Sequence, residues 1–338
     1  MMDAKFQKYI LNFKQPSGTS RGILNTKETY FLEISDKGKT GIGECSLFRG
    51  LSYDDVPDYE EKLLWLCNNI NEDVDILKEN LSQFPSIIFG LEQALANITR
   101  DTNIYFPSDF TEGKDSIKIN GLIWMGNEDF MQSQIEDKLK NNFTCIKLKI
   151  GINWHSEKDV IRSIRKKFPK EQIELRVDAN GAFSPEQAKN ILEELAELDI
   201  HSIEQPIKAG SWKAMAELCK NTPTPIALDE ELIGIVHTQA KKELLAEIKP
   251  QYLILKPSLV GGFSGSDQWI DLAEKNNINW WVTSALESNI GLNAIAQYTY
   301  NKKNPMPQGL GTGGLFTNNF PNPLALEGEN LWFRQSSL

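Results

Sequence analysis

The pattern of hydrophobic and polar positions changes about one third of the way along the chain. Up to residue 100, alternating runs that predict strands come first and apolar residues at helical spacing follow. The expected strands are 3–14, 26–36 and 39–46, and the expected helices are 55–80 and 84–100. Strands followed by helices, without alternation between the two, predict an α+β domain over residues 1–100.

After a polar stretch at 101–115, interpreted as a linker, short apolar runs alternate with helical patterns. The expected strands are 116–122, 144–150, 172–178, 200–204, 225–229, 252–256, 279–284 and 307–311. The expected helices are 127–140, 156–167, 185–198, 211–220, 237–245, 264–276 and 287–300. Eight strands with intervening helices predict a (β/α)₈ barrel over 116–324. The β-like segment within 325–338 is expected to return to the N-terminal domain.

Charged residues close several of the short apolar runs in the alternating region. Counted from Lys149, they follow at steps of 29, 26, 25 and 27 residues, about the length of a strand, a helix and two loops. These residues are Asp178, Glu204, Asp229 and Lys256. Because the carboxyl ends of the strands meet at the end of a β/α barrel that carries the active site, we expect these side chains and Lys147 to converge.

Three carboxylates at one barrel mouth favour a metal ion, because their repulsion and their desolvation are both unfavourable without a cation. Oxygen ligands favour Mg²⁺, or Mn²⁺ in its place, over Zn²⁺. The predicted metal ligands are Asp178, Glu204 and Asp229. A metal ion held this way stabilises the enolate that forms when a proton is removed next to a carboxylate. Lys149 is the predicted base, since cationic neighbours favour the neutral amine that a base must present.

Composition and charge narrow the possible functions. The chain has 338 residues, 40% of them apolar, and a mean hydropathy of −0.38, as in ordinary globular proteins. The net charge of −10 argues against nucleic-acid partners and against binding to an anionic membrane. The sequence has no long apolar run and no paired cysteine spacing, and we expect no signal peptide. We therefore expect a cytoplasmic protein with four free thiols and no membrane insertion. The oligomeric state does not follow from these features.

The chain resembles the enolase superfamily, in its muconate-lactonizing group, through five short motifs. They are Lys147-x-Lys149, Asp178-x-Asn180, Glu204-Gln205-Pro206, Asp229-Glu230-Glu231 and Lys256-Pro257-Ser258. The resemblance covers the whole chain and implies a TIM-like barrel with an N-terminal α+β domain that caps the substrate. Sites of this superfamily use a lysine or histidine base, with Mg²⁺ stabilising an ene-diolate.

Three further segments resemble those of a dehydrating member of that group, and this resemblance implies a small cyclohexadiene carboxylate as substrate. They are 43–47, 283–292 and 309–316. The resemblance implies that Lys149 removes the proton next to the carboxylate and assists departure of the hydroxyl group. The resemblance also implies that Lys256 stabilises the enediolate from the opposite face and that Lys147 supports Lys149. Asn180 and Glu230 are expected directly behind the metal ligands.

Two loops, 16–22 and 48–51, are expected to cover the barrel mouth. In the first loop we expect Arg21 to attract an anionic substrate and Ser20 to contact it. From the barrel side, Ser284 and Glu287 are the predicted substrate contacts.

Other functions stay open at this point. An N-acylamino-acid racemase or a dipeptide epimerase of the same superfamily needs a lysine on each face of the substrate, which Lys149 and Lys256 would provide. The stretch 311–314 has no acid to hold the ammonium group of a dipeptide, which counts against the epimerase. An inactive binding or scaffold barrel is disfavoured because all six charged positions are present.

Overall fold

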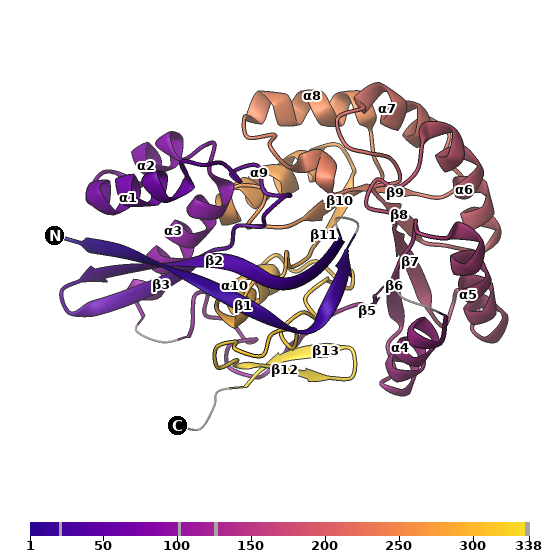
Figure 1. Cartoon of the computed structure of the whole chain (residues 1–338), viewed down its shortest axis with the longest axis horizontal. Coiled ribbons are helices and arrows are strands. Elements are labelled where there is room, and N and C mark those ends of the chain that lie inside the picture. Colours follow the sequence, from indigo (N-terminus) through magenta and orange to yellow (C-terminus); the bar gives the residue numbers. More distant parts are fainter. Residues whose placement is uncertain (20–21, 101–102, 125–127, 335–338) are drawn as a thin grey trace.

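The structure, a computed structural model, describes residues 1–19, 22–100, 103–124 and 128–334. Figure 1 shows an N-terminal sheet with three helices beside a larger parallel sheet, whose outer side is covered by further helices. The predicted change of pattern near residue 100 thus corresponds to a change of architecture.

The N-terminal part is an antiparallel sheet with helices packed on one face. Its strands, in spatial order, are β1 (Asp3–Thr19), β2 (Gly22–Asp36) and β3 (Lys39–Cys45). Its helices are α1 (Tyr59–Asn69), α2 (Val74–Asn80) and α3 (Pro85–Ile98). Alternation along β2 buries Tyr30, Leu32 and Ile34 in a core shared with these helices. A Cβ at Gly43 would lie 1.9 Å from the carbonyl oxygen of Gly90, so β3 and α3 pack backbone against backbone.

The three expected N-terminal strands are confirmed, but β1 and β2 reach Thr19 and Gly22, so most of the expected loop 16–22 is strand. The single helix expected over 55–80 is wrong. That segment forms α1 and α2. The Asp73 side chain accepts a hydrogen bond from the Asp75 N–H and so caps the start of a new helix. The helix expected over 84–100 is α3.

The larger part is built on a parallel sheet of seven strands in the order β11-β10-β9-β8-β7-β6-β5. The strands are β5 (Gly121–Ile123), β6 (Cys145–Lys149), β7 (Glu174–Asp178), β8 (Ser202–Glu204), β9 (Ile226–Leu228), β10 (Tyr252–Leu255) and β11 (Asn279–Val282). The helices are α4 (Glu128–Lys140), α5 (Trp154–Lys167), α6 (Pro185–Glu197), α7 (Trp212–Lys220), α8 (Thr238–Ile248), α9 (Gly262–Lys275) and α10 (Asn289–Asn301). The short helix η1 (Glu230–Leu232) follows β9. The predicted alternation of strands and helices is confirmed.

The expected eighth strand, 307–311, is not a regular strand. Gln308 and Gly309 make isolated bridges to Ile119 and Thr283, next to the edge strands β5 and β11. A closed eight-stranded barrel was predicted. The structure instead has an open parallel sheet of seven strands, and the irregular segment 307–311 lies between its two edge strands. The polar side chain of Gln308 is directed to the backbone here, accepting from the Val282 N–H at 2.8 Å.

A second departure concerns the C-terminal segment. β12 (Leu324–Glu327) and β13 (Asn330–Phe333) form a small antiparallel sheet with β4 (Ser116–Lys118), in the order β12-β13-β4. The single strand expected over 116–122 is therefore split between two sheets. The segment within 325–338 was expected to return to the N-terminal domain, but its strands pair with β4 and not with the N-terminal sheet. Contacts with β1 come instead from Phe316, which bridges to Phe13. The predicted boundaries at 100 and 115 stay predictions.

A small apolar cluster lies where the two parts meet. Phe13 from β1 and Phe48 from the segment after β3 pack with Leu259, Leu286 and Phe316 from the larger part. Ring centroids of Phe13 and Phe316 are 4.7 Å apart. This contact brings the N-terminal part next to the loops that follow β10 and β11.

Two expectations from composition can be compared with the structure. All four cysteines are free, as predicted. Across the residues that the structure describes, no helix is both long and apolar enough to cross a membrane.

Candidate active site

Consecutive strands place the predicted charged residues at one end of the parallel sheet. Lys149 of β6 lies beside Asp178 of β7 in the strand register, and Asp178 lies beside Glu204 of β8. Asp229 directly follows β9, and Lys256 directly follows β10. All of them stand at the carboxyl ends of their strands. The sequence spacing therefore located this end of the sheet correctly.

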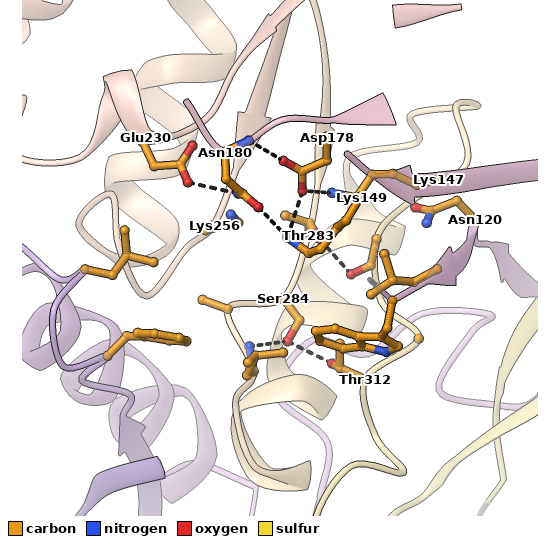
Figure 2. Close-up of a pocket in the computed structure, with 18 residues that line it drawn as sticks. Asn120, Lys147, Lys149, Asp178, Asn180, Glu230, Lys256, Thr283, Ser284 and Thr312 are labelled. Carbon is orange, nitrogen blue, oxygen red and sulfur yellow. Dashed lines mark hydrogen bonds and ion pairs between the residues drawn. The ribbon is translucent and has the colours of Figure 1, made fainter. Parts of the chain in front are cut away.

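Lys147 and Lys149 are two residues apart on β6, so their side chains point to the same face of the strand. The Lys147 Nζ lies 3.1 Å from Asp178 Oδ2 and 2.7 Å from Glu204 Oε2. The Lys149 Nζ also lies 3.1 Å from Asp178 Oδ2, and it donates to Asn180 Oδ1 at 2.7 Å. Figure 2 shows both ammonium groups directed at Asp178. One carboxylate thus faces two cations.

A second ion pair joins Lys256 to Asp229 on the far side of the site. Between the two pairs, Asn180 donates from its backbone N–H to Asp178 Oδ1 at 3.1 Å and from its side chain to Glu230 Oε1 at 3.0 Å. Its φ of 44° lies in the left-handed region, which asparagine adopts more readily than most residues. Asn180 and Glu230 thus lie next to the carboxylates, where the resemblance placed them.

Burial and neighbouring charges oppose each other in setting the pKa values. Burial favours the neutral form of Asp178, but Lys147 and Lys149 lower the pKa of that carboxyl below its ordinary value. For Glu204, burial and the nearby Asp178 raise the pKa to about 7. Burial disfavours the charged forms of Lys147 and Lys256, yet the adjacent carboxylates raise the pKa of each. Both lysines are therefore cations at neutral pH.

The three predicted metal ligands have the chemistry that a hard cation requires. Asp178, Glu204 and Asp229 offer only oxygen donors, and each is 2% exposed. The Oε1 atom of Glu204 is buried and has no hydrogen-bond partner among the described residues, which a cation would satisfy. In the structure, however, these carboxylates form ion pairs with lysine side chains. No group of three Asp, Glu, His or Cys side chains in the described ranges is arranged to hold a metal ion. The donor set fits Mg²⁺, and metal binding stays a prediction.

A cavity opens beside the charged residues and is lined from both parts of the molecule (Figure 2). Phe48 and Leu51 line it from the N-terminal part, as expected for the loop 48–51. The sequence reasoning missed Asn120, Trp124 and Thr312, which also line it. Asn120 lies within an expected strand and Thr312 just follows one. Asn120 and Thr312 could have been found from the sequence, because each is a polar residue in or directly after an expected strand.

The predicted substrate contacts have different positions in the structure. Ser284 lines the cavity and accepts from Thr312 Oγ1 at 2.9 Å. Glu287 is fully buried and is not among the lining residues. Its carboxylate accepts from Ser284 Oγ at 2.5 Å, from Ser258 Oγ at 2.6 Å and from the Ala285 N–H at 2.8 Å. Glu287 therefore holds the loop after β11 in place instead of facing the cavity. Ser20 and Arg21 lie outside the described residues.

Comparison with known proteins gives the family. Residues 131–329 match the family described as enolase C-terminal domain-like, and the chain belongs to this family. It is 44% identical to an o-succinylbenzoate synthase from Desulfotalea psychrophila (strain LSv54 / DSM 12343), over 97% of this chain and 98% of that protein.

Solved structures agree with the sequence comparison. The crystal structure of MenC from Desulfotalea psychrophila LSv54 matches with a TM-score of 0.87 at 40% identity, covering 98% of this chain and 99% of that chain. A dipeptide epimerase from Enterococcus faecalis V583, complexed with Mg and the dipeptide L-Leu-L-Tyr, matches with a TM-score of 0.84. It is 18% identical and covers 98% of this chain and 96% of that chain, so this likeness shows the fold alone.

Proposed function

We propose that this chain catalyses the o-succinylbenzoate synthase reaction, the dehydration of 2-succinyl-6-hydroxy-2,4-cyclohexadiene-1-carboxylate to 2-succinylbenzoate. The observation that carries the proposal is the 44% identity to such a synthase over nearly the whole chain. The ion-paired lysines and carboxylates at the strand ends support it, because they provide the groups that proton abstraction next to a carboxylate requires. The chain is accordingly a carbon–oxygen lyase that acts on a small carboxylate.

Lys149 is the proposed base. It takes the proton from the carbon next to the substrate carboxylate, and the electrons of the C–H bond pass into that carboxylate as an enediolate. Cleavage of the C–O bond then expels the hydroxyl group. This group receives the proton from Lys149 and leaves as water while the ring becomes aromatic. Lys147, buried beside Asp178 and Glu204, keeps a positive charge near the base.

Lys256 stabilises the developing negative charge from the other side of the cavity. It follows β10, and three strands separate β10 from β6, which carries Lys149. Its pKa, raised by Asp229 against the effect of burial, keeps it cationic. A fixed cation in a buried site stabilises an anionic transition state strongly, since the charge is already oriented.

Asp178, Glu204 and Asp229 would hold Mg²⁺, for which Mn²⁺ can substitute. Bound there, the ion would stabilise negative charge on the substrate carboxylate. The unpartnered Oε1 of Glu204 and the oxygen-only donor set support this assignment. Asn180 and Glu230 would orient these ligands through the hydrogen bonds that join them.

One observation favours a second activity. Lys149 and Lys256 both line the cavity, and two lysines on different sides are what racemisation of an N-acylamino acid needs. The cavity wall formed by Gly309, Gly311 and Thr312 carries no carboxylate for a dipeptide ammonium group, which disfavours the epimerase.

The test is a direct comparison of substrates. The purified protein is incubated with the cyclohexadiene precursor and, separately, with panels of N-acylamino acids and dipeptides. We expect dehydration of the precursor, followed through the absorbance of the aromatic product, to exceed any racemisation in kcat/KM. Racemisation without dehydration would contradict the proposal.

Two further assignments belong to this proposal. The N-terminal part, over residues 1–100, would act as the capping domain, a role supported by the place of Phe48 and Leu51 in the cavity wall. The cytoplasm is the proposed location, as expected for an enzyme with four free cysteines.

A further inference from the structure

A buried glutamine connects the strand ends that carry two of the proposed metal ligands. Gln205 directly follows Glu204 and is fully buried. Its Oε1 accepts from the backbone N–H groups of Asp229 at 3.1 Å and Glu231 at 3.2 Å. Its Nε2 donates to the Ile207 carbonyl at 3.0 Å and to Glu231 Oε2 at 3.0 Å. The carboxamide thus uses both its donors and both its acceptor positions.

The backbone of Gln205 is held as firmly as its side chain. Its N–H donates to the Ala227 carbonyl at 2.9 Å, and its carbonyl accepts from the Gly181 N–H at 2.7 Å. These bonds tie the end of β8 to β9 and to the turn after β7. Gln205 nevertheless has a φ of 40°. A non-glycine residue in this region is strained and persists only where its surroundings fix it, typically near functional sites.

We infer that Gln205 is a positioning residue that fixes the separation of Glu204 and Asp229, and that the affinity of the site for a divalent cation depends on it. The inference rests on the proposed metal role of these carboxylates. Glu204 precedes Gln205 in the chain, and Asp229 is held through its backbone N–H by the side chain of Gln205. Two carboxylates at the ends of the neighbouring strands β8 and β9 are thereby linked through one residue. Glu231 completes the link, because its Oε1 accepts from the Gly210 N–H at 2.7 Å.

The chain contains a matched control in Gln297 on α10. Gln297 is also fully buried, and its Oε1 accepts from two backbone N–H groups, those of Tyr105 at 2.8 Å and Phe106 at 3.0 Å. Its Nε2 donates to the Asn103 carbonyl at 2.8 Å and to Asn293 Oδ1 at 2.9 Å. Gln297 thus makes four hydrogen bonds as Gln205 does, two as acceptor and two as donor, except that one of its acceptors is an amide oxygen where Gln205 has the Glu231 carboxylate. Gln297 does not line the cavity.

The experiment measures Mn²⁺ binding to the full-length protein by electron paramagnetic resonance, without substrate. We expect Gln205→Met to weaken Mn²⁺ binding about 10- to 100-fold, the usual effect of removing a group that orients metal ligands. Gln297→Met loses the same number of hydrogen bonds, so its thermal stability should also fall while its Mn²⁺ affinity stays at the wild-type value.

A pair of polar variants tests the same idea if Gln205→Met does not fold. Gln205→Glu keeps the acceptor for Asp229 and Glu231 but places a carboxylate against that of Glu231, so Mn²⁺ binding should weaken. Adding Glu231→Gln restores a donor and an acceptor at this contact, and the double variant should recover most of the affinity.

The outcomes separate the inference from the function on which it rests. Wild-type protein that binds Mn²⁺, together with unchanged affinity in the Gln205 variants, would overturn the inference alone. Equal weakening in the Gln205→Met and Gln297→Met variants would also overturn it, because the effect would then follow general stability. Wild-type protein that does not bind Mn²⁺ would overturn the proposed metal site, and the inference with it.

Discussion

Lys147 and Lys241 are both buried, in different regions of the molecule, and their pKa values are shifted in opposite directions. At the strand ends, Lys147 lies between Asp178 and Glu204, and its pKa is raised despite burial. Lys241, on α8, faces α9 and is 1% exposed, and burial lowers its pKa to about 8. Its Nζ donates to Gln268 Oε1 at 2.9 Å and lies 5.3 Å from the centroid of the Trp269 ring.

The difference shows that burial alone does not decide the state of a lysine. Two uncharged oxygens, Gln268 Oε1 and the Gly265 carbonyl at 3.4 Å, and an aromatic ring do not replace the hydration that Lys241 loses, so its charged form is costly. Carboxylates around Lys147 more than offset the same loss. The carboxylates at the strand ends therefore keep several buried lysines charged. Buried positive charges of this kind can stabilise an anionic transition state.

The largest expected effect comes from the cation that the carboxylates are proposed to hold. Chelation of divalent metal should abolish dehydration, because the lysines alone would not stabilise the enediolate sufficiently. Added Mg²⁺ or Mn²⁺ should restore it, measured as product formation after dialysis against a chelator. Full activity in metal-depleted protein would show that the lysine–carboxylate pairs suffice. As a control, a Lys241→Met variant should respond to chelation as the wild type does.

The two lysines that line the cavity should differ when each is replaced by arginine. Lys149→Arg should lower kcat/KM for dehydration by about 10²–10⁴-fold, because guanidinium stays protonated and cannot act as a base. Lys256→Arg should keep measurable dehydration, since it supplies charge without proton transfer, and any racemase activity should vanish. Rates with the cyclohexadiene precursor are compared. Equal residual dehydration in the two variants would contradict the roles assigned to the two lysines.

Replacing each compared lysine by methionine should change stability in opposite directions. Lys147→Met leaves Asp178 and Glu204 without their shared cation, which should lower the free energy of unfolding by about 3–5 kcal/mol. Lys241→Met removes a charge that burial disfavours and should raise it by roughly 2–3 kcal/mol near pH 7. Urea denaturation measures both. If the free energy of unfolding changed in the same direction in both variants, the proposed difference between the two lysine environments would be contradicted.

The smallest expected effect is the change with pH in the contribution of Lys241 to the free energy of unfolding. Its folded pKa of about 8 lies below its ordinary value of 10.5, so the unfolded chain binds more protons between these limits. The contribution of Lys241 to the free energy of unfolding must then rise with pH from about 8 to about 10.5. The advantage of Lys241→Met over the wild type should therefore shrink across this range. An advantage that is constant from pH 7 to pH 10 would show that packing, not charge, accounts for it.

The sequence predicted the charged end of the sheet well because one strand-helix unit has a characteristic length. The steps from Lys149 to Lys256 therefore reported the strand ends directly. Glu287, expected as a substrate contact from the segment 283–292 and not from this spacing, is turned inward to hold Ser284 and Ser258. A polar residue in a loop has no periodic pattern that would show which way it points.

Hydrophobic periodicity and the spacing of charged residues by themselves determined the alternating architecture, the separate N-terminal part and the positions of six charged side chains. Only the tertiary structure decided that Lys147 pairs with both Asp178 and Glu204, that the segment 324–333 joins β4, and that Gln205 links the ends of β8 and β9. The physical reason is the range of the interactions. Strand and helix patterns depend on near neighbours in the chain, whereas ion pairs and buried hydrogen bonds depend on which distant segments the fold brings within about 3 Å.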